Sequence, residues 1–264
     1  MKYVDIHCHL DFPDYDSDRE EVLVRMREKE VGAITIGADL ESSKRAVKIA
    51  ETNENVWACV GVHPDNAPFA PPLNLRGGRG ELGELVLSKK TVAIGECGLD
   101  YFRLDPAFAK ATAGKQKKLF ESQIQFAIKH NKPLMLHIRD AYEDALEILV
   151  NYKKEAGKKL RGNVHFFAGD TKIAKKFLDL DFTLSFTGVI TFTHDYDEVI
   201  KYIPPNSIMS ETDAPFVAPV PYRGKRNEPI YVIEVVKKMA EIRGENEDIL
   251  SEAIINNAKR VFGI

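Results

Sequence analysis

The sequence has little cysteine and no closely spaced cysteine pair. Its three cysteines, Cys8, Cys59 and Cys97, are far apart, show no CxxC spacing and lie in short apolar runs. Three isolated cysteines provide no disulfide framework, so we expect reduced thiols that pack as small apolar side chains.

Long hydrophobic runs are also missing. No apolar stretch reaches the roughly 18 residues that a membrane-spanning helix needs. Residues 1–5 are followed by two histidines and not by the apolar segment of a signal peptide. We therefore expect a soluble, cytoplasmic protein that does not associate with membranes.

The sequence has no excess of positive charge. Lys and Arg total 37 and Asp and Glu total 40, which gives a net charge of −3. This balance does not resemble that of a protein that holds many phosphates along a duplex, so a nucleic-acid substrate would have to be bound locally. The basic segment 222–226 could make such a contact, or it could be a group of solvated loop charges.

Short runs rich in Val, Ile, Phe and Cys alternate with longer amphipathic segments, which is typical of βαβ units around a parallel sheet. The predicted strands cover residues 3–9, 33–37, 56–62, 92–97, 134–138, 163–167, 183–186 and 208–212. The predicted helices cover residues 19–29, 42–51, 116–130, 142–154, 173–180, 196–202, 229–243 and 246–262.

Eight strands in strict alternation with helices predict an α/β fold, a (β/α)8 TIM barrel that forms a single domain over residues 1–264. An open nucleotide-binding sheet would carry a glycine-rich phosphate loop after the first strand, and this loop is absent.

Two segments, 66–80 and 104–114, interrupt the alternation and show no convincing helical or strand period. Both follow the carboxyl end of a predicted strand, so in a barrel they would overhang the face where active sites lie. We expect loop insertions there, which act either as lids or as surface loops without a chemical role.

Ionisable side chains gather at the carboxyl ends of the predicted strands. The first strand places two histidines at i and i+2, so both can point to one side. The carboxyl ends of barrel strands converge on one mouth, which would bring six potential metal ligands into one pocket. They are His7, His9, Glu96, His137, His165 and Asp213.

Each of these residues also has a purely structural explanation when it is taken alone. His137 or His165 could be a core histidine. Glu96 could pair with an arginine, and Asp213 could cap a helix. Their convergence favours metal ligation, because a buried carboxylate is costly unless it is compensated by positive charge.

Four histidines and two carboxylates form a mixed nitrogen and oxygen set, which suits divalent ions such as Mg²⁺, Zn²⁺ or Mn²⁺. Two such ions would lower the pKa of a water held between them and stabilise the oxygens of a displacement reaction. Asp213 is then well placed to act as general base. The pattern therefore predicts a hydrolase.

These motifs also occur in a familiar order. Residues 4–10, 61–64, 95–101, 136–139, 165–169 and 211–215, continued by 218–229 and 257–262, resemble the TatD-type metal-dependent hydrolases of the amidohydrolase superfamily. The resemblance implies a binuclear site. In it, His7, His9 and Asp213 would hold one ion and His137 and His165 the other. Glu96 would bridge the two ions and take part in catalysis.

The resemblance further implies a metal-dependent deoxyribonuclease with 3′-to-5′ exonuclease action, whose substrate is a single-stranded DNA end. The implied substrate contacts are His63, Tyr101, Arg139, Tyr222 and Arg223. We infer no obligate protein partner.

Arg139 follows His137 by two residues and would share its inward face, where a guanidinium can bind a phosphate. The alternative for Arg139 is a surface ion pair with Asp140 or Glu143. The alternative function is an amide or ester hydrolase, such as an aminoacyl-tRNA deacylase, with the same binuclear site.

Overall fold

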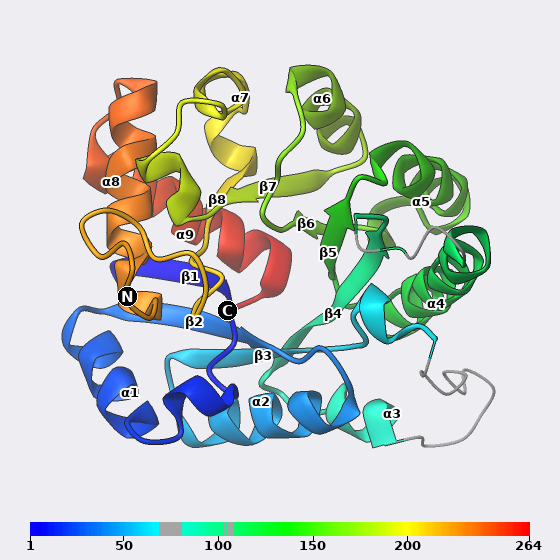
Figure 1. Ribbon diagram of the computed structural model, residues 1–264, viewed down its shortest axis with the longest axis horizontal. Helices are drawn as coiled ribbons and strands as arrows, with labels where there is room; N and C mark the ends of the chain where they lie inside the picture. The colour runs from blue at the N-terminus through cyan, green and yellow to red at the C-terminus, as the bar shows by residue number, and fades with distance from the viewer. Residues whose placement is uncertain (69–80, 103, 105–107) are drawn as a thin grey trace.

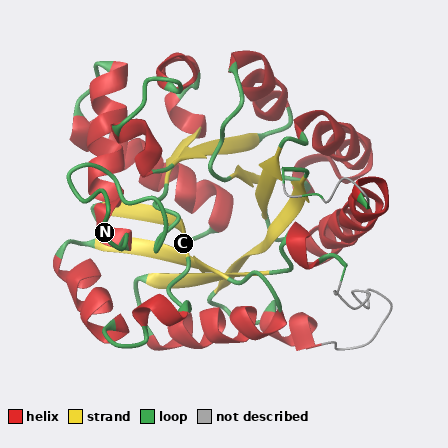
Figure 2. Cartoon of the chain, in the orientation of Figure 1, coloured by secondary structure: helices red, strands yellow, loops and turns green. Residues whose placement is uncertain are grey.

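The computed structural model describes residues 1–68, 81–102, 104 and 108–264 (Figure 1). In this part of the chain, eight strands form one parallel sheet in the order β1 to β8. Figure 2 shows the strands inside and the helices around them. The predicted α/β class and (β/α)8 TIM barrel are therefore confirmed. The strands are β1 (Tyr3–Cys8), β2 (Val31–Ile36), β3 (Val56–Val60), β4 (Thr91–Asp100), β5 (Leu134–Arg139), β6 (Gly162–Val164), β7 (Phe182–Phe186) and β8 (Ile208–Ser210).

The first strand and the segment after the last strand lie side by side. Cys8 pairs with Ala214 in a parallel bridge. The backbone N–H of Asp213 donates to the carbonyl of His7 over 2.9 Å. These contacts bring the two ends of the sheet together, which places residues from β1 and from the segment after β8 on the same side of the pocket.

Helices cover the outside of the sheet. They are α1 (Arg19–Glu28), α2 (Leu40–Thr52), α3 (Glu81–Leu85), α4 (Ala109–His130), α5 (Tyr142–Ala156), α6 (Thr171–Asp179), α7 (Asp197–Tyr202), α8 (Val232–Arg243) and α9 (Glu247–Phe262). The short helix α3 was not predicted, because five residues are too few to show a helical period. Among the described residues, no helix has both the length and the apolar character needed to span a membrane.

Several helix ends follow from single residues. The side chains of Asp39, Asp170 and Asn246 accept hydrogen bonds from backbone N–H groups in the first turns of α2, α6 and α9. Helices α4 and α8 end at Asn131 and Gly244, both in the left-handed conformation that such residues tolerate. The residues at these helix ends therefore determine where the helices begin and end.

The predicted insertion at 104–114 is partly wrong. Helix α4 begins at Ala109 and not at residue 116, so residues 109–114 form its first turns. Alanine has the highest helix propensity, and a Cβ at Gly114 would meet no other atom within 4 Å, so this glycine faces open space. Residues 69–80, 103 and 105–107 lie outside the described residues, and with them most of the segment 66–80.

Both faces of the strands are covered. Strands β1, β2 and β4 are buried along their whole length, as expected for a parallel sheet that is enclosed by helices. The cysteines, Cys8, Cys59 and Cys97, are free and buried in the core, which confirms the prediction of reduced thiols that pack as small apolar groups.

Candidate metal centre

The carboxylate of Glu96 lies at the centre of the pocket. Glu96 comes from β4 and is 4% exposed. Its Oε1 lies 2.8 Å from Nδ1 of His137 and 3.0 Å from Nε2 of His165. Its Oε2 lies 3.6 Å from Nε2 of His7 and 3.9 Å from Nε2 of His9. The two oxygens of one carboxylate therefore face two separate groups of histidine nitrogens.

Asp213 completes the group around Oε2 of Glu96. Its Oδ1 lies 3.7 Å from Nε2 of His7 and 3.5 Å from Nε2 of His9. The residue adopts a positive φ of 54° just after β8, which directs its side chain toward the first strand. The six residues that the sequence singled out are thus brought together in one cluster, in which His7 is fully buried and the other five line the pocket.

The donor atoms are spaced as ligands of cations would be. In the part of the chain that the structure describes, three overlapping groups have ligand atoms within 4.8 Å of one another. They are His7 with His9 and Glu96, His7 with His165 and Asp213, and His63 with Glu96 and His137.

His7 provides a test of whether a cation fits. Both of its ring nitrogens are buried and have no hydrogen-bond partner in the protein. An unpaired buried imidazole is costly, and a cation at Nε2 would satisfy it. Imidazole nitrogens with carboxylate oxygens also suit divalent metals, so the residues fit such an ion.

Outer partners orient the other three histidine rings. Nδ1 of His9 lies 3.1 Å from the carbonyl of Ile36, which leaves Nε2 facing the pocket. Nε2 of His137 lies 3.1 Å from Asp100. Nδ1 of His165 lies 3.3 Å from Glu211. Such partners fix the tautomer and direction of a metal-binding histidine.

Sequence reasoning missed Asp100 and Glu211. Both are buried carboxylates next to predicted site motifs, at Leu99-Asp100-Tyr101 and Glu211-Thr212-Asp213. A buried acid beside a candidate ligand was the available signal, because such an acid needs a partner.

The charges of the cluster shift its pKa values strongly. Burial alone would raise the pKa of Glu96, but the charge of His165 and of neighbouring histidines holds that pKa well below its usual range. Burial alone would lower the pKa of His165, but Glu96 and Glu211 raise it well above its usual range. A cation that binds Nε2 of His165 must therefore compete with a proton for that nitrogen.

His63 lies beside the group around Oε1 of Glu96. It follows β3 and precedes the 3-10 helix η2 (Pro64–Asn66), with Nε2 3.6 Å from Glu96. Its Nδ1 accepts a hydrogen bond from the backbone N–H of Asp65 over 3.2 Å. A neutral His63 ring therefore carries its proton on Nε2, which suits donation to a substrate better than metal ligation.

Arg139 lines the pocket at the end of β5. Its guanidinium lies over the ring of Phe102, 3.6 Å from the ring centroid. The predicted alternative partner Glu143 pairs with Lys176 at 2.9 Å. Among the described residues Arg139 forms no ion pair, so its N–H donors are available to a substrate.

Three predicted substrate contacts lie elsewhere. Tyr101 donates its hydroxyl to Asp144 over 2.7 Å. Side chains alternate along β4, so Tyr101 points away from the face of Glu96 and Asp100. The substrate contact that the resemblance implies for Tyr101 therefore stays a prediction.

The basic segment 222–226 is also held by the protein. The ring of Tyr222 stacks on Tyr231 at 3.8 Å, and the guanidinium of Arg223 lies 4.0 Å above the ring of Phe192. Neither Tyr222 nor Arg223 lines the pocket, and their contact with a substrate stays a prediction. Arg226 binds both carboxylate oxygens of Asp18, each over 2.7 Å.

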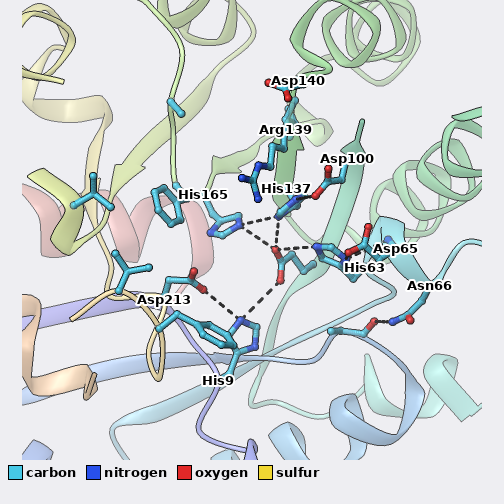
Figure 3. A pocket seen from close by; sticks show the side chains of 18 of the residues that line it. His9, His63, Asp65, Asn66, Asp100, His137, Arg139, Asp140, His165 and Asp213 are labelled. Carbon is cyan, nitrogen blue, oxygen red and sulfur yellow. Dashed lines mark hydrogen bonds and ion pairs between the residues drawn. The ribbon is translucent and has the colours of Figure 1, made fainter. Parts of the chain in front are cut away.

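The pocket has a volume of about 870 Å³ and two different walls. Beside His9, the rings of Phe12 and Phe216 meet edge to face at 5.7 Å, and Phe216 is 47% exposed. Across the cluster from His9 lie Arg139 and Asp140 (Figure 3). The cavity therefore offers an aromatic surface on one side and charged groups on the other.

Comparison with known proteins agrees with this geometry. Residues 4–263 match the family model described as TatD related DNase. The chain is 37% identical to the metal-dependent hydrolase YabD of Bacillus subtilis, over 98% of both chains. It is 34% identical to the metal-dependent hydrolase YcfH of Escherichia coli strain K12, over 100% of this chain and 97% of the relative.

A solved structure is similar over the same length. The TatD homologue YjjV of Escherichia coli K12 is 27% identical, with a TM-score of 0.88 over 100% of this chain and 98% of that one. The match extends across all eight strands, so it includes the segments that supply the pocket.

Proposed function

The chain belongs to the TatD DNase family of metal-dependent hydrolases, and from this premise we propose that it is a deoxyribonuclease that removes nucleotides from single-stranded DNA ends in the 3′-to-5′ direction with two divalent cations. The observation that carries the proposal is the carboxylate of Glu96, whose two oxygens face two groups of donors. A phosphodiester displacement needs charge stabilisation at both the attacking and the leaving oxygen, which suits a paired site.

The two cation positions follow from the two sides of Glu96. His7, His9, Asp213 and Oε2 of Glu96 would hold one cation. Oε1 of Glu96 with His137 and His165 would hold the other. Mg²⁺, Mn²⁺ or Zn²⁺ suit this donor set, and when bound they would acidify a water and neutralise charge on the substrate.

Asp213 is placed to move the proton. Its side chain is 15% exposed, against 6% or less for His7, His9 and Glu96 around it. A carboxylate at the open side of the cluster can accept a proton from water and release it to solvent. His63 lies near the group around Oε1 of Glu96 and can donate a hydrogen bond from Nε2–H to a phosphate oxygen.

The two walls of the pocket fit an unpaired nucleotide. Arg139 can hold a phosphate by two parallel hydrogen bonds. The aromatic side chains Phe12 and Phe216 can stack on a base, and every base presents a flat face for such stacking. A net charge of −3 agrees with an enzyme that holds one strand end locally.

The test is a substrate panel with a matched pair of arginine variants. The purified chain is supplied with Mg²⁺, Mn²⁺ or Zn²⁺ and given 5′-labelled single-stranded DNA, RNA or aminoacyl-tRNA. We expect stepwise shortening of the DNA. Arg139→Ala should lower kcat/KM on DNA about 10- to 100-fold, the value of one or two charged hydrogen bonds. Arg223→Ala, outside the pocket, should stay within about twofold.

Two outcomes would contradict the proposal. If DNA stays intact with every cation while aminoacyl-tRNA is hydrolysed, the enzyme is an ester hydrolase and not a nuclease. If Arg139→Ala and Arg223→Ala behave alike on DNA, then Arg139 does not bind the phosphate.

A further inference from the structure

Glu211 is a buried carboxylate that stands behind the metal centre. It directly follows β8 and is fully buried. Its Oε1 accepts hydrogen bonds from the backbone N–H of Phe166 and, over 3.0 Å, from the hydroxyl of Ser185. Its Oε2 lies 3.3 Å from Nδ1 of His165 and 3.9 Å from Nδ1 of His7.

The charge of Glu211 has no ordinary counter-ion. In the described part of the chain, its ion-pair partners are the two histidines, with no lysine or arginine among them. A buried carboxylate is costly without compensation. An N–H at Nδ1 of His165 provides that compensation, and it leaves Nε2 of His165, which lies 3.0 Å from Oε1 of Glu96, as the ring nitrogen that can bind a cation.

The same oxygen faces His7. The rings of His7 and His165 stack at 3.8 Å with an angle of 10°, so the two rings are nearly parallel. Nδ1 of His7 has no hydrogen-bond partner, and Oε2 of Glu211 is the carboxylate oxygen that approaches it.

The two histidines serve different cation positions. His7 belongs to the group around Oε2 of Glu96, and His165 belongs to the group around Oε1. We propose that Glu211 is a positioning residue shared by both cation positions, which sets the tautomer and ring direction of one histidine ligand in each. Asp100 provides the contrast, because it contacts His137 alone among the ligands and so serves one position. This inference rests on the two-cation part of the proposed function and not on the identity of the substrate.

The experiment measures Mn²⁺ binding by calorimetry to the full chain after treatment with a chelator. In Glu211→Gln the amide keeps the size but presents a donor where Oε2 accepts, so it cannot orient both histidines. We expect the Mn²⁺ affinity to fall about 10- to 100-fold at both positions, as is typical for loss of an outer partner. Asp100→Asn should lose a similar factor at one position only.

A control variant separates positioning from general stability. Glu228 is a buried carboxylate that pairs with Arg25 at 2.9 Å, away from the pocket. Glu228→Gln should lower the unfolding temperature and leave both Mn²⁺ affinities within about twofold. For Glu211→Gln, the rise in unfolding temperature on Mn²⁺ addition should shrink, which a purely structural role of Glu211 would not produce.

Unchanged Mn²⁺ affinities in Glu211→Gln would overturn the proposal. A loss of affinity at one position only would overturn the claim that Glu211 serves both cation positions. If Glu211→Gln does not fold, Glu211→Asp keeps the charge on a side chain that is one methylene shorter. It should bind Mn²⁺ more weakly at both positions, and wild-type affinities there would overturn the proposal as well. A chain that binds two Mn²⁺ ions normally and leaves DNA intact would contradict the nuclease and not the role of Glu211.

Discussion

Replacement of Gln123 by leucine should cost more stability than its position on a helix suggests. Gln123 on α4 is fully buried, and its amide exchanges two hydrogen bonds with the backbone of Val62, each 2.8 Å long. Val62 immediately precedes His63. Helix α4 thus holds the end of β3 beside the metal centre through one side chain.

The expected cost follows from the groups that lose their partner. In Gln123→Leu the N–H and the carbonyl of Val62 both stay buried, and each unsatisfied group costs about 1–3 kcal/mol. The added apolar contact of leucine offsets part of this. We expect the free energy of unfolding to fall by about 2–5 kcal/mol, and the released segment to displace His63.

Urea unfolding of the chelated protein, followed by circular dichroism, measures this change. Gln125 is the matched control, because it lies on the same helix, is exposed and bonds to the hydroxyl of Tyr152. Gln125→Leu should change the free energy of unfolding by no more than about 0.5 kcal/mol. If Gln123→Leu costs less than about 1 kcal/mol, the two amide bonds do not hold β3 and the reasoning fails.

Three further predictions concern the pocket and its supports. Chelation of divalent cations should abolish hydrolysis and lower the unfolding temperature, and re-addition of a cation at 100 times its dissociation constant should restore about 2.7 kcal/mol per position, measured by thermal melts. Gly98→Ala should lower the free energy of unfolding by at least about 3 kcal/mol or prevent folding, because Gly98 has φ +143° and a Cβ would lie 2.0 Å from the carbonyl oxygen of His137. A soluble variant with wild-type stability would refute this prediction. Hydrogen bonds from Arg226 lower the pKa of Asp18. This pair therefore stabilises the folded chain above the unfolded pKa of about 3.9, and the stabilisation is lost as the pH falls through the lower folded pKa. In urea unfolding, Asp18→Asn should lose less free energy of unfolding between pH 7 and pH 3 than the wild-type chain.

The sequence was sufficient to predict the barrel and the convergence of the six candidate ligands. Strand ends can be located from apolar runs, and in a closed parallel barrel all of these ends meet at one mouth. His7, Glu96 and Asp213 could be placed together for this reason, although they are far apart in the chain.

Contacts that depend on strand phase or on loop conformation could not be predicted. The family resemblance made Tyr101 a candidate substrate contact, yet its hydroxyl donates to Asp144 just beyond the end of β4. The partners of a buried acid such as Glu211 depend on which histidine rings pack against it in the folded chain. The local sequence around Glu211 does not contain this information. The role of the basic segment 222–226 could not be predicted either, because Arg226 and Asp18 are far apart in the sequence and come into contact only in the folded chain.

The bond between Asp213 and His7 joins residues that are separated by most of the chain. During synthesis on the ribosome, the cation position that these residues share remains incomplete until the last strand has emerged. A chain that stops before Asp213 would therefore lack one ligand of this cation position, and we expect it to show no hydrolytic activity. In this way the architecture makes cleavage chemistry depend on a residue that is synthesised after all eight strands.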